Sequence, residues 1–242
     1  MLALAVDTST KLGSVAVLRD GGLLGVRVTA SGAPHASGLF NDLQVLLDQL
    51  RIHIKVFDLF AVAAGPGSFT GLRVGLTAVK AWAEALKRPI VAASSLEAIA
   101  IQAEGLPDVP ADALTVAVQD ARRGQVFGCV YQQSGDSRHA LQPLSEEVLL
   151  SADEFLELAE ELVGQRQSII VSPAPEVVQS AIRGSAFERA RVETVSGVLA
   201  PFIGKLGYAR ALRGEVIDAL HLDANYVRRT DAEVKWTDRS PA

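Results

Sequence analysis

The chain has almost no cysteine and lacks any long apolar run. Cys129 is the single cysteine among 242 residues, which excludes an internal disulfide. It lies in an apolar stretch, so we expect a small buried core residue. No apolar run reaches the ~18 residues of a membrane-spanning helix. The first ten residues have no basic segment, and Asp7 interrupts their apolar run. We therefore expect no signal peptide, no membrane partner and a cytoplasmic location.

Basic clusters are also missing. The formal net charge is −5, and the lysines and arginines are scattered along the chain. A protein that holds nucleic acid alone usually carries a basic patch, so any RNA should be held chiefly by another subunit. The acidic run at 146–161 is interpreted as a solvated helix face. With 49% hydrophobic and 21% charged residues, the chain can bury a core and is not disordered.

The glycine-rich segment GPGSFTG, residues 65–71, does not match the sequence motifs of three common kinds of binding or catalytic site. It has no lysine where a phosphate-binding Walker loop needs one, and its third glycine is one residue late for a dinucleotide loop. Ser68 lies one residue too early for a hydrolase elbow. The four histidines are far apart in sequence and form no H-x-x-x-H pair. We predict no catalytic residue and no metal site.

Residues 58–88 form the unit around which the chain is organised. Leu59–Ala64 is an apolar run that predicts a strand buried on both faces. Gly65-Pro66-Gly67 predicts a sharp turn, and Ser68 is a good N-cap for a helix over 68–86. Two interpretations of this turn stay open. Its amides hold an anion, or it lets glycines of the helix pack against a neighbour.

Small residues recur along one face of this helix, at Gly71, Gly75, Ala78, Ala81 and Ala85. A glycine inside a helix costs up to about 1 kcal/mol relative to alanine. Two glycines in the first two turns therefore predict that another segment packs there at backbone distance.

The sequence of the rest of the first half predicts a β-meander, with strands at 2–7, 14–18 and 23–29. A helix at 36–51 follows a link at 31–34, and its apolar residues cover more than one stripe. After a strand at 89–93, Ser94 and Ser95 predict the cap of a helix, with Glu97 completing a capping box.

The opening pattern returns in the second half. Residues 2–22 and 114–135 both run through a strand, an acidic residue, a polar turn, a glycine and a second strand. Asp7 and Gly13 of the first copy parallel Asp120 and Gly124 of the second. The similarity predicts two lobes built on one plan.

Leu106–Pro110 is the best boundary between these lobes. We expect an N-terminal lobe at 1–105, joined by a helix at 198–213, a smaller lobe at 106–197, and a tail at 214–242 that is polar and irregular from Leu222, apart from residues 225–227. The smaller lobe should contain a helix near 151–163, a buried strand at 168–171 and a helix near 175–183.

Asp7, at the end of the first strand, has two open interpretations. Its carboxylate holds magnesium or a water near a nucleotide phosphate, or it forms an Asx turn that satisfies the amides of Ser9 or Thr10. Asp120 with Arg122 and Arg123 is most simply a charged turn.

Five segments, in order over nearly the whole chain, resemble the bacterial TsaB (YeaZ) family. They are AVDTS at 5–9, GPGSFTGLRVGL at 65–76, SSLEAIA at 94–100, DARRGQVF at 120–127 and NYVRR at 225–229. The resemblance implies a duplicated, two-lobed, actin-like α/β fold of the sugar kinase, Hsp70 and RNase H-like type. It also implies a role in making N6-threonylcarbamoyladenosine beside the tRNA anticodon. In that pathway the relative TsaD carries the metal and transfers the threonylcarbamoyl group. TsaB pairs with TsaD through N-lobe helices, and the ATPase TsaE joins them.

Departures from catalytic relatives agree with a passive role. ATP-binding members of the fold carry an Asp-x-Gly-Thr run, where this chain has Asp7, Thr8, Ser9 and Thr10. The turn at 120–124 also lacks a phosphate-type glycine pair, and the paired metal histidines of TsaD are missing. Family members usually have a methionine where Gln119 stands. We expect a non-catalytic scaffold without cofactor, in which Asp7 to Thr10 are the candidates for any nucleotide contact. The alternative is a nucleotide-using enzyme of the same fold, and a protease ranks last.

The scaffold hypothesis needs a partner surface. We expect the helices at 36–51 and 68–86 to face a TsaD-like paralogue, to form a homodimer when alone, and to bury ~1,600 Å² or more. A TsaE-like ATPase would join, and tRNA would be reached only through the complex. About half of the candidate contacts should be core. The candidates are Leu39, Leu43, Leu46, Gly71, Leu72, Arg73, Gly75, Leu76 and Val79.

Overall fold

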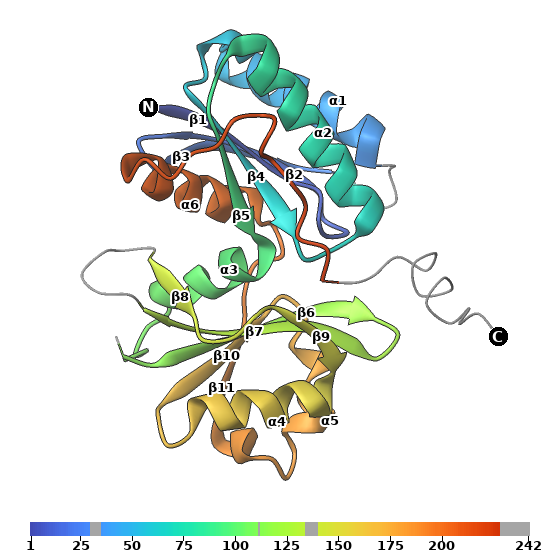
Figure 1. Cartoon of the computed structure of the whole chain (residues 1–242), viewed down its shortest axis with the longest axis vertical. Coiled ribbons are helices and arrows are strands. Elements are labelled where there is room, and N and C mark those ends of the chain that lie inside the picture. The colour runs from blue at the N-terminus through green and yellow to red at the C-terminus, as the bar shows by residue number, and fades with distance from the viewer. Residues whose placement is uncertain (30–34, 111, 134–139, 228–242) are drawn as a thin grey trace, which may run out of the picture.

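A computed structural model describes residues 1–29, 35–110, 112–133 and 140–227. Two lobes lie one above the other, each built on its own sheet, with a short helical segment between them (Figure 1). The predicted link at 31–34, His139 and the two arginines that end NYVRR fall outside the described residues.

The first sheet has the strand order β3-β2-β1-β4-β5. The predicted meander is confirmed, because β1, β2 and β3 pair antiparallel, whereas β4 and β5 continue the sheet in parallel. The strands are β1 (Leu2–Asp7), β2 (Ser14–Arg19), β3 (Gly22–Val28), β4 (Leu59–Gly65) and β5 (Ile90–Ser94).

Helices cover both faces of this sheet. On one face lie α1 (His35–Leu50) and α2 (Phe69–Leu86), and on the other lies α6 (Ala200–Leu212). Alternate side chains of β1 separate the two cores, since Leu4 and Val6 join the α1 and α2 side and Ala5 joins the α6 side.

Two glycines let α6 lie close to the sheet. A Cβ at Gly204 would come 2.1 Å from a methyl group of Leu18, and one at Gly207 would come 2.7 Å from the Cβ of Ala61. Distances this short are never tolerated between real side chains, so the approach of α6 depends on both glycines.

The second sheet runs β11-β10-β6-β7-β8, with β9 also paired to β7. Its face away from the first lobe is covered by α4 (Ala152–Val163) and α5 (Gln179–Ile182). The strands are β6 (Leu114–Arg122), β7 (Gln125–Gln133), β8 (Leu141–Pro143), β9 (Val148–Ser151), β10 (Ser168–Ser172) and β11 (Arg191–Thr194).

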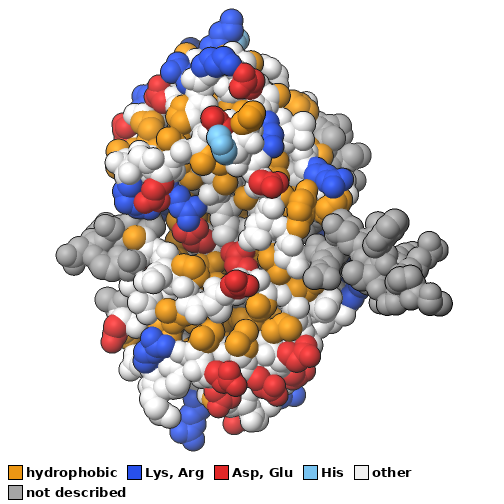
Figure 2. Space-filling view, in the orientation of Figure 1, with side chains coloured by type: hydrophobic (Ala, Val, Ile, Leu, Met, Phe, Trp, Pro, Cys, Tyr) orange, Lys and Arg blue, Asp and Glu red, His pale blue; other side chains and the backbone are white. Residues whose placement is uncertain are grey.

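Two predictions for this lobe need correction. The helix near 175–183 is a 3-10 turn, Pro175–Val177, followed by the four residues of α5, and Gly184 with a φ of 77° ends it. The strands β8, β9 and β11 were not predicted. The acidic run is confirmed as a solvated face only along α4, whose acidic side chains are exposed and gather at the base of the molecule (Figure 2). Glu147, in the same run, is half-buried.

The lobes are joined through α3 (Ser95–Ala100) and the 3-10 helix Ile101–Gly105. One cluster of buried residues runs from the α6 face of the first sheet through α3 to β6 and β7, and it includes Cys129. Cys129 is fully buried, as predicted. Its burial raises the pKa of the thiol to about 11, which keeps the sulfur protonated and unreactive.

The sequence repeat corresponds to a structural repeat. In the first lobe β1 pairs antiparallel with β2 and parallel with β4, and β6 has the same relation to β7 and β10. The Oδ1 atoms of Asp7 and Asp120 each accept a hydrogen bond from the amide two residues later, at 2.8 Å and 2.7 Å. The two-lobed plan predicted from the repeat is confirmed.

After α6 the chain forms a strap, residues 215–227, which is irregular but closely packed. Ile217 and Ile90 exchange two backbone hydrogen bonds of 2.8 Å, so the strap covers the free edge of β5. Leu222 is buried on the α2 side of the sheet. The amide of Asn225 then donates to the carbonyl of Ala64 at 2.7 Å, which brings the strap to the cleft between the lobes.

Candidate functional site

The start of α2 closes over the loop that follows β1. A Cβ at Gly71 would lie 2.0 Å from the carbonyl oxygen of Thr8, and one at Gly67 would lie 2.4 Å from that of Ser9. The Thr8 hydroxyl donates to the carbonyl of Gly71 at 2.7 Å. The predicted packing at backbone distance is therefore confirmed.

Asp7 lies at the bottom of this loop. Its Oδ1 accepts from the amide and the hydroxyl of Ser9, at 2.8 Å and 2.6 Å, so the Asx turn is confirmed. Its Oδ2 is buried without a hydrogen-bond partner. The structure places Asp7 and Thr8 beneath α2, and it places Ser9 and Thr10 in the lining of the interlobe cleft.

Burial of the whole carboxyl group raises the pKa of Asp7 from 3.8 to about 6, while the hydrogen bonds from Ser9 oppose the rise. A carboxyl group whose pKa is raised by folding favours the native state when protonated. The free energy of unfolding therefore falls as the pH rises from about 4 to about 6.

Asp7→Asn is expected to remove this loss, because the amide oxygen keeps the Ser9 contacts without a charge. At pH 7.5 the variant should be about 3 kcal/mol more stable than wild type, and the gap should close near pH 4. Urea unfolding across this range measures it, with the exposed Asp108→Asn as control. Parallel stability curves for wild type and variant would show that the buried carboxyl group does not ionise within this range.

The cleft between the lobes has a volume of about 560 Å³. It is walled by the loop after β1, the start of α2, the β6–β7 hairpin and the end of the strap. The polar and charged residues in its lining are Ser9, Thr10, Lys11, Ser68, Gln119, Asp120, Arg122, Arg123, Glu176, Asn225 and Tyr226.

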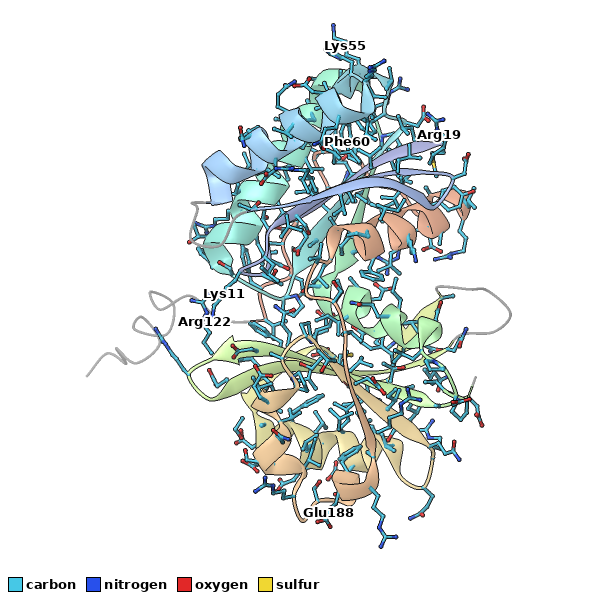
Figure 3. All side chains as sticks on the ribbon, turned by 180° about the vertical axis from the view of Figure 1, so that it is seen from behind. Lys11, Arg19, Lys55, Phe60, Arg122 and Glu188 are labelled. Atoms are coloured by element: carbon cyan, nitrogen blue, oxygen red, sulfur yellow. The ribbon has the colours of Figure 1, made fainter. Side chains whose placement is uncertain are left out.

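The hairpin tip is held in an unusual backbone shape. Arg122, Arg123 and Gly124 all have positive φ angles, of 64°, 57° and 74°. Asp120 braces the turn by accepting the Arg122 amide, so the charged turn predicted here is confirmed. From behind, Lys11 of the first lobe and Arg122 of the second lie close together at the boundary between the lobes (Figure 3).

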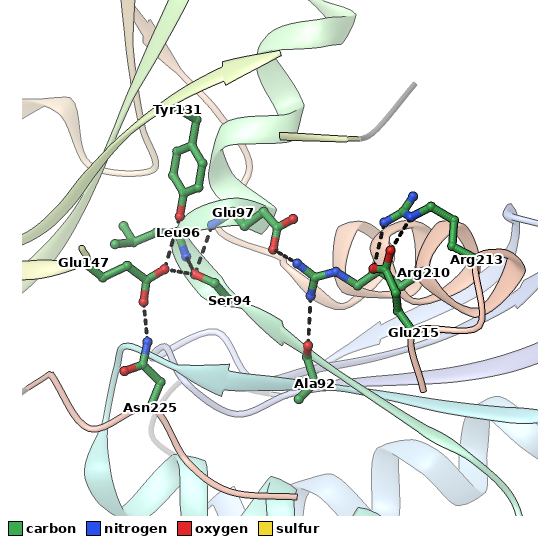
Figure 4. A network of polar contacts seen from close by, with 10 residues as sticks. All are labelled: Ala92, Ser94, Leu96, Glu97, Tyr131, Glu147, Arg210, Arg213, Glu215 and Asn225. Carbon is green, nitrogen blue, oxygen red and sulfur yellow. Dashed lines mark hydrogen bonds and ion pairs between the residues drawn. The ribbon is translucent and has the colours of Figure 1, made fainter. Parts of the chain in front are cut away.

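A network of polar groups ties the lobes to the strap (Figure 4). The carboxylate of Glu147 accepts from the hydroxyl of Ser94, from the hydroxyl of Tyr131 at 3.1 Å and from the side-chain Nδ2 of Asn225 at 2.5 Å. Burial raises the pKa of Glu147, and these donors oppose it. The sequence carries no signal for this network, because its members lie up to 131 residues apart.

A second part of this network links α3 to α6. Ser94 caps α3 by accepting from the amides of Leu96 and Glu97, as predicted. Glu97 does not complete the predicted capping box. It pairs instead with Arg210 of α6 at 2.6 Å, and Arg210 also donates to the carbonyl of Ala92 at 2.9 Å. Burial raises the pKa of Glu97, against the pull of Arg210.

The expected partner contacts on α1 and α2 require a correction. Arg73 alone among them is exposed, and the others lie in the lobe's own core: Leu39, Leu43, Leu46, Gly71, Leu72, Gly75, Leu76 and Val79. The wide apolar stripe of α1 is needed within the monomer, because α1 packs on β2, β3 and α2 together. The idea that about half of these side chains stay at the surface is wrong.

Membrane spans and metal-binding clusters are both missing from the described residues. No helix among them has the length and apolar character of a membrane span. Across the same residues, no group of three or more histidine, cysteine, aspartate or glutamate side chains is arranged to hold a metal ion.

Comparisons with known proteins agree with one another. The protein-family model described as TsaD, tRNA N6-adenosine threonylcarbamoyltransferase, matches residues 23–198. The tRNA threonylcarbamoyladenosine biosynthesis protein TsaB of Bacillus subtilis is 30% identical over 244 residues, with 98% of this chain and 99% of that protein covered. TsaB of Escherichia coli is 29% identical over 133 residues, or 55% of this chain and 56% of that protein.

Solved structures extend the comparison to the fold. YeaZ from Pseudomonas aeruginosa has a TM-score of 0.74 and 24% identity, covering 93% of this chain and 99% of that one. A ROK family protein from Streptococcus pneumoniae in complex with sucrose has a TM-score of 0.50 and 10% identity, covering 89% and 100%. The predicted duplicated α/β fold of actin-like type is thereby confirmed.

Proposed function

Because the chain belongs to the TsaB (YeaZ) family, we propose that it acts in the biosynthesis of threonylcarbamoyladenosine in tRNA as a non-catalytic subunit. The observation that carries this proposal is the 30% identity with the Bacillus subtilis protein along 98% of the chain. A TsaD-like paralogue would transfer the threonylcarbamoyl group. This chain would supply a surface to that partner and allow a TsaE-like ATPase to join.

The geometry of the first loop supports a passive role. In the duplicated fold this loop faces the cleft where a nucleotide would sit, but Asp7 and Thr8 are buried, and the Oδ1 of Asp7 and the hydroxyl of Thr8 are already hydrogen-bonded to Ser9 and Gly71. The N-cap site of α2 is also taken, since Ser68 accepts from the amide of Gly71 at 3.3 Å. These groups would have to leave their partners to hold a phosphate.

The alternative, a nucleotide-using enzyme, has one favourable observation. Ser9, Thr10 and three cations line the same cleft. Calorimetry of the purified chain with ATP and magnesium separates the two functions. Micromolar binding with hydrolysis by the chain alone would favour the enzyme.

We place the partner surface on the exposed ridges of α1 and α2. Phe40 of α1 is 52% exposed, and its ring packs edge-to-face against the ring of Trp82 of α2, with 5.9 Å between the ring centres. The two helices therefore share an aromatic contact at the surface. Arg73, Thr77 and Ala81 continue along the exposed side of α2. Small and aromatic side chains of this kind suit the close packing of helices across an interface. The same ridges would form a homodimer in the absence of the partner.

Ala81→Arg is expected to weaken capture of the TsaD-like protein of the same cell by at least about 10-fold, because a long charged side chain would be driven into the interface. The matched control is Gln179→Arg, an exposed helical position of the other lobe. A reconstituted tRNA modification assay should require this chain and should lose most of its activity with Ala81→Arg. Unchanged capture by a folded Ala81→Arg protein would place the partner elsewhere, and modification without this chain would refute the function.

A further inference from the structure

The mouth of the interlobe cleft combines free cations, exposed aromatic rings and a buried acceptor without a partner. We propose that it binds single-stranded RNA of the tRNA substrate, with phosphates on Lys11, Arg122 and Arg123 and a base on Tyr226. This inference rests on the proposed function and adds to it a direct contact with RNA.

The cations come from both lobes. Lys11 follows β1, and Arg122 and Arg123 form the tip of the β6–β7 hairpin. Among the described residues none of the three has a carboxylate within 4.0 Å to form an ion pair, whereas Arg191, Arg210 and Arg213 all do. Cations held close together without carboxylate partners, on both sides of a cleft, attract a phosphate backbone.

The cleft also contains two carboxylates, Asp120 and Glu176. Asp120 accepts a hydrogen bond from the backbone amide of Arg122. The three cations of the cleft outnumber its two acidic groups. The local charge is therefore positive on a protein whose net charge is −5. A patch of this strength suits a secondary contact with RNA that is held mainly by the partner subunit.

Aromatic rings lie at the same opening. Tyr226 is 42% exposed, and its ring lies 4.9 Å from that of Phe69. The guanidinium of Arg73 is 3.8 Å from the centre of the Phe69 ring and donates to the Tyr226 hydroxyl at 3.3 Å. A ring fixed in this way is a platform on which an unpaired base can stack, with little loss of side-chain entropy.

The floor of the cleft supplies an acceptor. Gln119 is 93% buried, since only 7% of its surface is exposed, and its Oε1 has no hydrogen-bond partner. A buried acceptor left unpaired costs about 1–3 kcal/mol. The exocyclic amine of a base is a donor of suitable size, and in RNA an unpaired base presents it without the deep, narrow major groove that shields it in a helix.

Two other ligands fit less well. A free nucleotide needs a phosphate cradle at depth, but the start of α2 is pressed against the carbonyl of Ser9, and the cations stand at the mouth. An acidic peptide would use the cations, but its carboxylate side chains have no planar ring to stack on Tyr226. A continuous RNA strand uses all three features.

The test uses this chain together with its TsaD-like partner and a labelled single-stranded RNA oligonucleotide. The double variant Arg122→Gln/Arg123→Gln should bind the RNA roughly 20-fold more weakly at about 0.1 M salt, and the slope of log affinity against log salt should fall by about 1.4. The matched control is Arg183→Gln/Arg189→Gln, two exposed arginines of the same lobe, which should bind like wild type. Ultraviolet cross-linking should join the RNA to the peptide that carries Tyr226.

Several results would overturn the proposal. Equal losses in both double variants would indicate general electrostatics. Saturation by AMP or ATP at the same affinity would identify a free nucleotide as the ligand, and equal binding of poly-glutamate would identify an acidic peptide. Partner capture is measured in parallel. If modification depends on the chain but Arg122→Gln/Arg123→Gln is as active as wild type and binds RNA equally well, the RNA contact is wrong and the proposed function stands.

Discussion

Gly71→Ala is expected to lower the free energy of unfolding by about 3 kcal/mol. At an ordinary helical position the same change stabilises by up to about 1 kcal/mol. The sign reverses here because the new Cβ would lie 2.0 Å from the carbonyl oxygen of Thr8. That oxygen belongs to the loop after β1, whose backbone is fixed by the hydrogen bonds between Asp7 and Ser9. Neither this loop nor α2 can therefore move away without losing stabilising contacts.

Thermal and urea unfolding measure the effect. For a chain of this length the loss corresponds to a fall in Tm of roughly 6–12 °C. Gly105→Ala is the matched control, because a Cβ there meets nothing within 4 Å, and its stability should stay within about 0.5 kcal/mol of wild type. A Gly71→Ala protein as stable as the control would mean that the loop after β1 yields readily, and the packing argument would be wrong.

The glycines of α2 illustrate what a sequence can reveal. Gly71 and Gly75 lower the helix propensity of the first two turns of α2 and bring no local benefit. Residues of this kind indicate a contact with another segment. The caps Ser68 and Ser94 are equally local, since each accepts from an amide within three residues. The repeat of Asp7 and Asp120 was visible because both copies keep the strand, the acidic residue and the turn in the same order.

Other features depend on distant pairing that a sequence does not show. The strands β8, β9 and β11 have only three or four residues each, too few for an alternating pattern. The donors to Glu147 come from β5, β7 and the strap. Nothing near Gln119 in the chain shows that its side chain ends in a cleft. An apolar stripe likewise does not reveal whether it covers a sheet of its own lobe or a partner, which is why Leu76 was assigned to an interface and is core.

The correction at Leu76 changes how an interface variant must be chosen. Because the Leu76 side chain is only 6% exposed, Leu76→Glu would place a charge in the core and unfold the lobe. Loss of partner binding would then say nothing about the surface. Ala81 is exposed on the same helix, so a charge there tests the interface without disturbing the core.

Arg210→Met is expected to destabilise the protein by about 3 kcal/mol, the lower end of the range for a broken buried ion pair. Glu97 keeps only 8% of its side-chain surface exposed, and Arg210 keeps 25%. Methionine fills most of the space of the arginine stem, so the principal loss is the partner of the buried Glu97 carboxylate. The matched control is Arg213→Met, because Arg213 pairs with Glu215 at the same 2.6 Å distance but at the surface, with 39% and 51% exposed. Its removal should cost no more than about 1 kcal/mol.

The pH dependence shows whether the loss is electrostatic. Burial already raises the pKa of Glu97 above 4.5, and Arg210 lowers it, so the variant should raise this pKa further. A carboxyl group with a raised native pKa destabilises the fold increasingly as the pH rises above its unfolded value. The gap between wild type and Arg210→Met should therefore be large at pH 7.5 and small near pH 4, and adding Glu97→Gln should recover most of it. A gap that is the same at both pH values would assign the loss to the hydrogen bond from Arg210 to Ala92 and to the packing of its stem between α6 and β5.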